Sequence, residues 1–190
     1  MINKISIIQL AEIITGYPFR TSLGELAGDD IMVVQAKDIL VGSDINLNNA
    51  FKIAHQNFNS KSLLKKGDVV LSVRGKFRAS VIKEDINNII ASSSVYVLRI
   101  TYSGIIPEYL SIYLNSRNGQ KQINERISGA VIKTILKSDL ANLQIAVPSL
   151  EIQNQIIKIY NNNQCQQKLL TQKQFLTNKI TEGAINKLLN

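Results

Sequence analysis

The chain has 190 residues, of which 45% are hydrophobic and 19% charged, and this excludes both a disordered tail and two full domains. Its net charge of +8 at pH 7 favours polyanionic partners, because a positive field attracts them and raises the encounter rate. No apolar run approaches the roughly 20 residues of a membrane span, and the first residues show no signal or transit pattern. We therefore expect a cytoplasmic protein without membrane contact.

Metal and nucleophile chemistry has few residues available. Cys165 is the only cysteine and His55 the only histidine, so neither a disulfide nor a zinc-thiolate cluster can form within the chain. His55 stands in a polar stretch without a nucleophile motif, which favours a surface or phosphate-contacting role over catalysis. The sequence also lacks a glycine-rich dinucleotide motif, a phosphate loop and a methyltransferase tetrapeptide. We expect no metal site, no cofactor and no catalytic residue in this chain.

In the first part of the chain, residues 10–16 have apolar positions at helical spacing and Gly16 as a stop, which predicts a short helix. A loop over residues 17–22 follows. Ile31–Gln35 is predicted as a buried strand, and residues 42–62 as loops on a scaffold. Residues 25–44 are acidic apart from Lys37, whereas residues 52–78 are basic apart from Asp68.

The strongest local signal is a β-hairpin. Gly67 and Asp68 mark a turn, Val69–Val73 a strand, Gly75 a second turn and Ala79–Lys83 the returning strand. Three basic side chains gather at its tip: Arg74, Lys76 and Arg78. They either contact nucleic acid or merely solvate the turn.

Later segments alternate between strand and helix. Ile89–Ile100 is predicted as one strand, with Ser92, Ser93 and Ser94 in its first half. A helix is predicted from Pro107 to Gly119 and a second one over residues 120–127. An extended segment follows to Lys137, then one helical turn capped by Ser138 and Asp139, then the strand Leu143–Val147.

From Leu150 to Asn190 there is no proline, which predicts one long helix of roughly 60 Å with Gly183 as its weakest point. Such a polar helix is marginal alone, so it either folds back on residues 1–148 or pairs with a helix of another chain. The expected pairing residues share one side of the helix: Ile156, Tyr160, Leu169, Leu176 and Ile180.

Four segments in this order resemble a type I restriction-modification specificity subunit, in a half-size form with one target recognition domain. The segments are Ile14–Thr21, Lys66–Gly75, Ala91–Arg99 and Asp139–Ile156. The usual junction of this family has a second proline and a Glu-Gln pair, where this chain has Ser149 and Gln153-Asn154. Full members carry two recognition domains and two spacer helices, whereas this chain has one of each.

The resemblance implies a mixed α+β (α/β) recognition domain over residues 1–148, followed by a spacer and dimerisation helix over residues 149–190. It implies that the helix pairs as an antiparallel coiled coil, in a homodimer or with another half subunit, unless the chain is a truncated remnant. It also implies non-catalytic recognition of double-stranded DNA, with methyltransferase and motor-nuclease subunits as partners. S-adenosylmethionine, ATP and magnesium would then act only on those partners.

Arginine and lysine serve as charges on phosphates, and arginine can also bind the O6 and N7 of guanine. The candidate DNA-binding residues are Arg20, Thr21, Ser22, Lys61, Lys65, Lys66, Arg74, Lys76, Arg78, Ser92, Ser93 and Ser94. Burial in a strand is the commoner explanation for such serines, and the three lysines are expected to add attraction rather than specificity. Two other functions stay open, a general nucleic-acid-binding protein and a magnesium-dependent nuclease.

Overall fold

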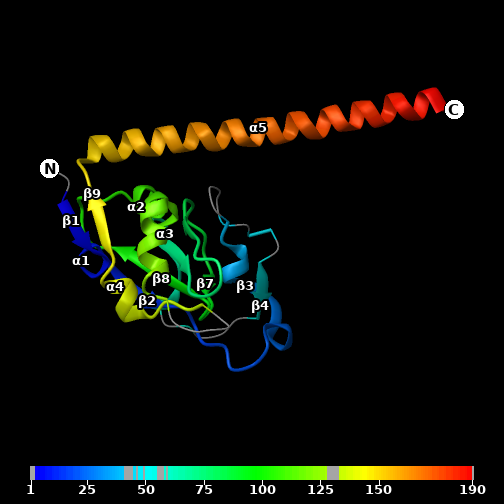
Figure 1. Cartoon of the computed structure of the whole chain (residues 1–190). Coiled ribbons are helices and arrows are strands. Elements are labelled where there is room, and N and C mark those ends of the chain that lie inside the picture. The colour runs from blue at the N-terminus through cyan, green and yellow to red at the C-terminus, as the bar shows by residue number, and fades with distance from the viewer. Residues whose placement is uncertain are drawn as a thin grey trace.

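The structure is a computed structural model that describes residues 3–40, 45, 47–48, 50–54, 58, 60–127 and 133–189. A mixed α+β domain is followed by one long helix that lies along the domain and then projects beyond it (Figure 1). The expected fold class is confirmed. His55 and the segment 128–132, which includes Val131 and Ile132, lie outside the described residues.

Two larger sheets form the domain. The central sheet has the order β2 (Ala11–Thr15), β8 (Val95–Ile100), β5 (Val69–Ser72) and β6 (Ala79–Val81), with antiparallel neighbours throughout. The second sheet has the order β4, β3 and β7, in which β3 pairs parallel to β7. Its strands have the bounds Phe51–Ile53 (β4), Ala27–Val34 (β3) and Ile89–Ala91 (β7).

The remaining elements surround these sheets. A two-stranded sheet joins β1 (Asn3–Ser6) to β9 (Gln144–Val147). The short helices are α1 (Ile7–Leu10), α2 (Pro107–Asn115), α3 (Arg117–Asn124) and α4 (Lys137–Ala141), with 3₁₀ turns at Leu23–Leu26, Ala36–Asp38 and Ser60–Ser62. Helix α5 runs from Leu150 to Leu189 without interruption, so the predicted long helix is confirmed and Gly183 does not break it.

The central sheet is apolar on both faces. Leu71 and Leu98 pack with Leu110 of α2 in the largest core cluster, whereas Val70 and Val97 belong to a second cluster on the opposite face. Successive strand residues point to opposite faces, so burial of both faces explains the uninterrupted apolar run of β5.

The predicted hairpin is confirmed as β5 and β6, with β6 ending at Val81. The helix predicted over residues 10–16 is wrong. Helix α1 ends at Leu10, and Ala11–Thr15 forms β2 beside β8. Ala11 and Ile13 are buried while Glu12 is exposed, which is strand alternation rather than a helical stripe. Hydrogen bonding to β8 stabilises residues 11–15 as a strand, and this outweighs their local helical spacing.

Other boundaries also differ from the predictions, among them those of β3, which begins at Ala27, and of α3, which begins at Arg117. The strand predicted over Ile89–Ile100 is two strands of different sheets, separated by a turn at residues 92–94. Helix α2 ends at Asn115 because Ser116 caps the next helix by accepting a hydrogen bond from the Gly119 N–H. Helix α4 begins at Lys137, one residue before the predicted Ser138–Asp139 cap.

Candidate nucleic-acid interface

Strand register brings three predicted site segments to one end of the central sheet. Tyr96 of β8 is opposite both Thr15 of β2 and Leu71 of β5, so β2 and β5 end where β8 begins. The loop at residues 17–22, the turn at 74–78 and the turn at 92–94 therefore share this end. We call these three segments the loop end. In Figure 1 the chain between β2 and β3 runs on the side of the domain away from α5.

The loop after β2 is fastened to the turn before β8. The Tyr17 N–H donates to the Ala91 carbonyl at 2.7 Å, and the Ser93 N–H donates to the Tyr17 carbonyl at 2.9 Å. The approach is so close that a Cβ on Gly16 would lie 2.0 Å from the Ser92 carbonyl oxygen. Only glycine fits this position, which explains the Thr15-Gly16-Tyr17 motif.

Aromatic packing supports the exposed part of the same loop. Tyr17, Phe19 and Phe58 meet edge to face, with Tyr17 centroids 4.9 Å from Phe19 and 4.8 Å from Phe58. The consecutive residues Arg20, Thr21 and Ser22 are exposed. The Ser22 hydroxyl donates to Glu25 at 2.9 Å, so this serine stabilises the turn, while Arg20 and Thr21 face solvent.

The hairpin turn is held from within by Ser72. This buried hydroxyl donates to the Lys76 carbonyl at 2.6 Å and accepts from the Arg78 N–H at 2.8 Å. Gly75 has a φ of 73°, which glycine adopts without strain. Arg74 and Lys76 are exposed and Arg78 is half-buried, so cations project from a rigid support.

A basic residue that sequence reasoning missed joins this turn. The Gly75 N–H donates to the Lys133 carbonyl at 3.0 Å, and the Ile135 N–H donates to the Val73 carbonyl at 3.2 Å. Exposed Lys133 therefore lies beside the hairpin and helps to line an open groove. The other lining residues are Gly75, Lys76, Phe77, Arg78, Asn115, Gln120 and Asn124. Cations beside amide side chains suit a phosphate backbone and base edges.

The three serines divide into two roles. Ser92 is buried with its Oγ 2.7 Å from the Ser94 Oγ, and Ser94 accepts from the Ala36 N–H at 3.1 Å. These two hydroxyls hold the turn, and Ser93 between them is exposed. Among the three, Ser93 is the one presented at the surface of the loop end.

The structure does not bring Lys61, Lys65 and Lys66 to the loop end. They precede β5, whose first residue, Val69, is opposite Leu98 near the far end of β8. Here Asp68 hydrogen-bonds to Arg99, which raises the pKa of Arg99 above its usual range. The lysines thus lie near the opposite end of the central sheet from Arg74.

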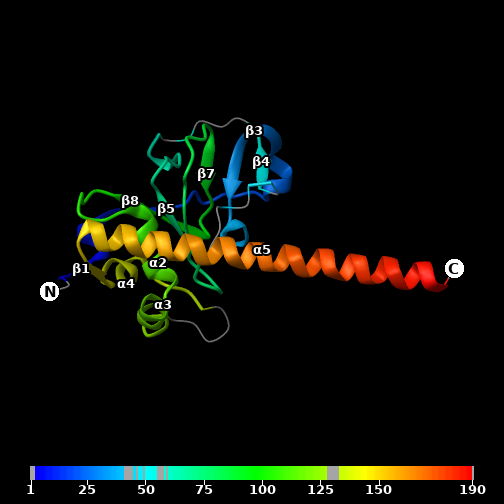
Figure 2. The same ribbon diagram turned by 90° about the horizontal axis from the view of Figure 1, so that it is seen from above.

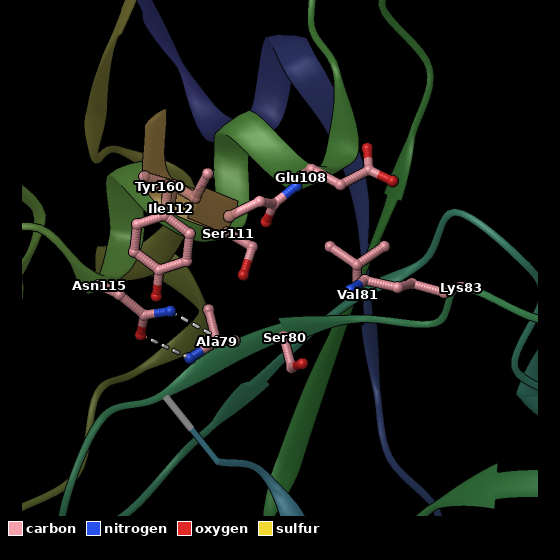
Figure 3. A pocket seen from close by; sticks show the side chains of 10 residues that line it. Ala79, Ser80, Val81, Lys83, Glu108, Ser111, Ile112, Asn115 and Tyr160 are labelled. Atoms are coloured by element: carbon pink, nitrogen blue, oxygen red, sulfur yellow. Dashed lines mark hydrogen bonds between the residues drawn. The ribbon is translucent and has the colours of Figure 1, made fainter. Parts of the chain in front are cut away.

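The predicted pairing residues of α5 also divide. Ile156 packs partly against the core of its own domain. Tyr160 lines a small pocket with Ser80 of β6 and Ser111 and Asn115 of α2 (Figure 3), and burial raises its pKa. By contrast, Leu169, Leu176 and Ile180 are exposed by 60%, 49% and 72%. Ile156 and Tyr160 thus contact the globular domain before α5, residues 3–148, which we call the head. Leu169, Leu176 and Ile180 are exposed to solvent.

Within the described parts of the chain, no group of three or more His, Cys, Asp or Glu side chains is placed to hold a metal ion. No helix of those parts has the length and hydropathy to span a membrane.

Solved structures share this fold. The chain matches the HsdS subunit from Thermoanaerobacter tengcongensis with a TM-score of 0.69 at 18% identity, covering 95% of this chain and 46% of that one. It matches the S subunit of a type I restriction-modification system from M. genitalium with a TM-score of 0.57 at 16% identity, covering 84% and 38%.

Sequence comparison agrees. The type I restriction enzyme EcoBI specificity subunit of Escherichia coli is 30% identical over 140 residues, which are 71% of this chain and 29% of that protein. The chain thus spans less than a third of the length of this curated relative. The model of the type I restriction modification DNA specificity domain matches residues 3–181. The resemblance seen in the motifs is therefore confirmed, and the chain belongs to the family of type I restriction-modification DNA specificity domains.

Proposed function

We propose that this chain reads one half of a bipartite double-stranded DNA target and performs no catalysis itself. The observation that carries this proposal is the loop end, where Arg20, Arg74, Lys76 and Arg78 project from hydrogen-bonded turns and Lys133 lies beside the hairpin turn. Cations on a rigid support bind phosphates in a defined register, and arginine can discriminate guanine. Membership of the DNA specificity family supports this role.

Two copies of the chain act together, paired through α5. Beyond Gln164, every described residue of α5 is exposed, and large apolar side chains recur there: Leu169, Leu170, Phe175, Leu176, Ile180, Ile185 and Leu188. Exposed apolar side chains along a helix of roughly 38 Å favour a helical partner. If the helix of a second copy packs antiparallel against α5, one recognition domain lies at each end of the helix pair. Such a two-fold dimer recognises a symmetric bipartite DNA sequence.

The partners supply the chemistry. Methyltransferase subunits bind the paired specificity chains and use S-adenosylmethionine, and the motor-nuclease subunit uses ATP and magnesium. The complex works on DNA in the cytoplasm. One structural match, at a TM-score of 0.68, comes from work on complex assembly in the type I R-M system, which is consistent with such partners.

Selection of bound oligonucleotides from a random pool, using the chain with its methyltransferase partner, tests the proposal. We expect two inverted copies of one short sequence at a fixed separation. Binding that is salt-sensitive but indifferent to sequence would instead indicate a general nucleic-acid-binding protein. Magnesium-dependent cleavage by the chain alone would indicate a nuclease.

A further inference from the structure

The joint between head and helix depends on one buried amide. Gln153, in the first turns of α5, has no exposed surface. Its Oε1 accepts from the Ile106 N–H at 2.9 Å, and its Nε2 donates to the carbonyls of Gly104 and Pro148, each at 2.9 Å. Both amide protons donate and the carbonyl oxygen accepts, so each polar atom of the side chain has a partner.

These three bonds connect three separate segments. Gly104 and Ile106 belong to the loop between β8 and α2, and Pro148 follows β9, the last strand of the head. The amide therefore ties the base of α5 to both of the head segments that flank it. Hydrogen bonds are directional, so this set fixes an angle as well as a contact.

The contacts farther along α5 specify direction less well. Ile156 and Ile157 pack against the core only in part, and Tyr160 stands over the pocket between β6 and α2. Figure 3 shows Tyr160 facing Asn115 and Ser111 across this space. Figure 2 shows that α5 then leaves the domain and continues alone. Apolar contact beside an open pocket permits tilting, whereas three directed bonds at the base oppose it.

We propose that Gln153 is a positioning residue that fixes the direction of α5 against the head and thereby the separation at which two heads read DNA. A tilt of about 10° at the base would move the far end of a 60 Å helix by roughly 10 Å. That displacement equals roughly 3 base pairs of duplex at 3.4 Å each. The consequence for DNA rests on the proposed function, whereas the fixed angle does not.

The angle can be measured without DNA. Cys165 is exposed on α5, and Ser138→Cys adds a second exposed label site at the start of α4 in the head. Electron-spin distance measurement between the two labels reports the tilt. The labelled chain is diluted with excess unlabelled Cys165→Ser protein, so that only distances within one chain contribute.

Two variants separate the donor and acceptor roles of the amide. Gln153→Met keeps the volume and removes all three bonds, and Gln153→Glu keeps an acceptor for Ile106 but loses both donors. Gln155→Met is the matched control, because Gln155 is exposed two residues along the same helix. We expect a narrow distance distribution for the parent and control, and at least a twofold broader one for Gln153→Met.

An unchanged width in both Gln153 variants would overturn the proposal. Loss of the folded head in both would overturn it too, since Gln153 would then stabilise the domain rather than its angle. Oligonucleotide selection completes the test: the parent should select one half-site separation, and Gln153→Met several. If Gln153→Met selects the same single half-site separation as the parent, Gln153 does not set the half-site spacing, and the proposed recognition of DNA is unaffected. A parent that selects no sequence would refute the proposed function, while the distances still decide the role of Gln153.

Discussion

Arg99 binds Asp68 through two hydrogen bonds, 3.0 Å from Nε to Oδ1 and 2.8 Å from Nη2 to Oδ2. Asp68 is 2% exposed and also accepts from the Lys65 N–H, while Arg99 donates to the Leu63 carbonyl. The pair therefore fixes the loop that enters β5 to the far end of β8. The motif residues Gly67 and Asp68 thus have a structural role at the end of the sheet opposite the loop end.

Replacing one partner of this pair should cost much stability. Arg99→Met leaves the Asp68 carboxylate buried without its cation, and we expect the free energy of unfolding in urea to fall by about 3 kcal/mol. Lys52→Met is the control, because the Lys52–Asp29 pair is 3.5 Å long and exposed. Its loss should cost under about 1 kcal/mol. Equal losses in the two variants would contradict the structural role of the Asp68–Arg99 pair.

Two glycines should respond in opposite directions to alanine. In Gly16→Ala the new methyl group collides with the Ser92 carbonyl, so the loop end must shift and unfolding should become easier by about 1 to 3 kcal/mol. At Gly183 nothing lies within 4 Å, and alanine should stabilise α5 by roughly 0.5 to 1 kcal/mol. Thermal unfolding followed by circular dichroism measures both. A neutral Gly16→Ala would show that the close approach is not maintained.

Elements with a local cause could be predicted from the sequence. The hairpin follows from glycine turns around a β-branched run, and α5 follows from forty residues without proline. Strand β2 could not be predicted, because Leu10, Ile13 and Ile14 satisfy helical spacing while Ala11 and Ile13 also satisfy strand alternation. Only the partner β8, which is more than eighty residues away, decides between the two.

The candidate site shows the same limit. Arg74, Lys76 and Arg78 are close in sequence, so their clustering was predictable. Lys133 lies beside them only because its segment hydrogen-bonds to the turn. Lys65 lies far from them because strand β5 runs between Lys65 and Arg74. The burial of Gln153 could likewise not be predicted from the sequence, since it depends on the position of the loop before α2.

The basic residues of the loop end should differ from those at the opposite end. Lys133→Ala and Lys76→Ala should each lower the dependence of DNA affinity on log salt by about 1 unit of slope, as expected for one phosphate contact. Arg74→Ala should cost about 1 to 3 kcal/mol of specific affinity if this arginine reads a base. Lys65→Ala, at the opposite end, is the control. Fluorescence anisotropy at several salt concentrations measures these effects, and a larger effect of Lys65→Ala would exclude the loop end.

Buried tyrosines should make the fold sensitive to alkali. Burial raises the pKa of Tyr109 and Tyr96 above the ordinary value of 10.0. The unfolded chain therefore loses these protons first as pH rises, so stability is fully present below pH 10 and declines above it. Tyr109→Phe removes the hydrogen bond to the Ala146 carbonyl, which should cost about 1 kcal/mol at pH 7. It should also make the decline above pH 10 shallower, as urea titrations at pH 8 to 11 would show. An unaltered alkaline slope would mean that Tyr109 ionises normally.

A negative charge on the side of α5 that carries Leu176 and Ile180 should dissociate the proposed dimer. Leu176 and Ile180 lie one turn apart and are exposed, whereas Asn178 between them points about 200° away at 100° per residue. Leu176→Asp and Ile180→Asp place carboxylates inside the expected contact, so each should shift sedimentation at micromolar concentration from dimer to monomer. Asn178→Asp adds the same charge on the opposite side and should leave the dimer intact. A parent chain that sediments as a monomer would remove the second copy as the partner of α5. The exposed apolar side chains would then need a different helix, and mixing with the methyltransferase subunit would show whether that protein provides it.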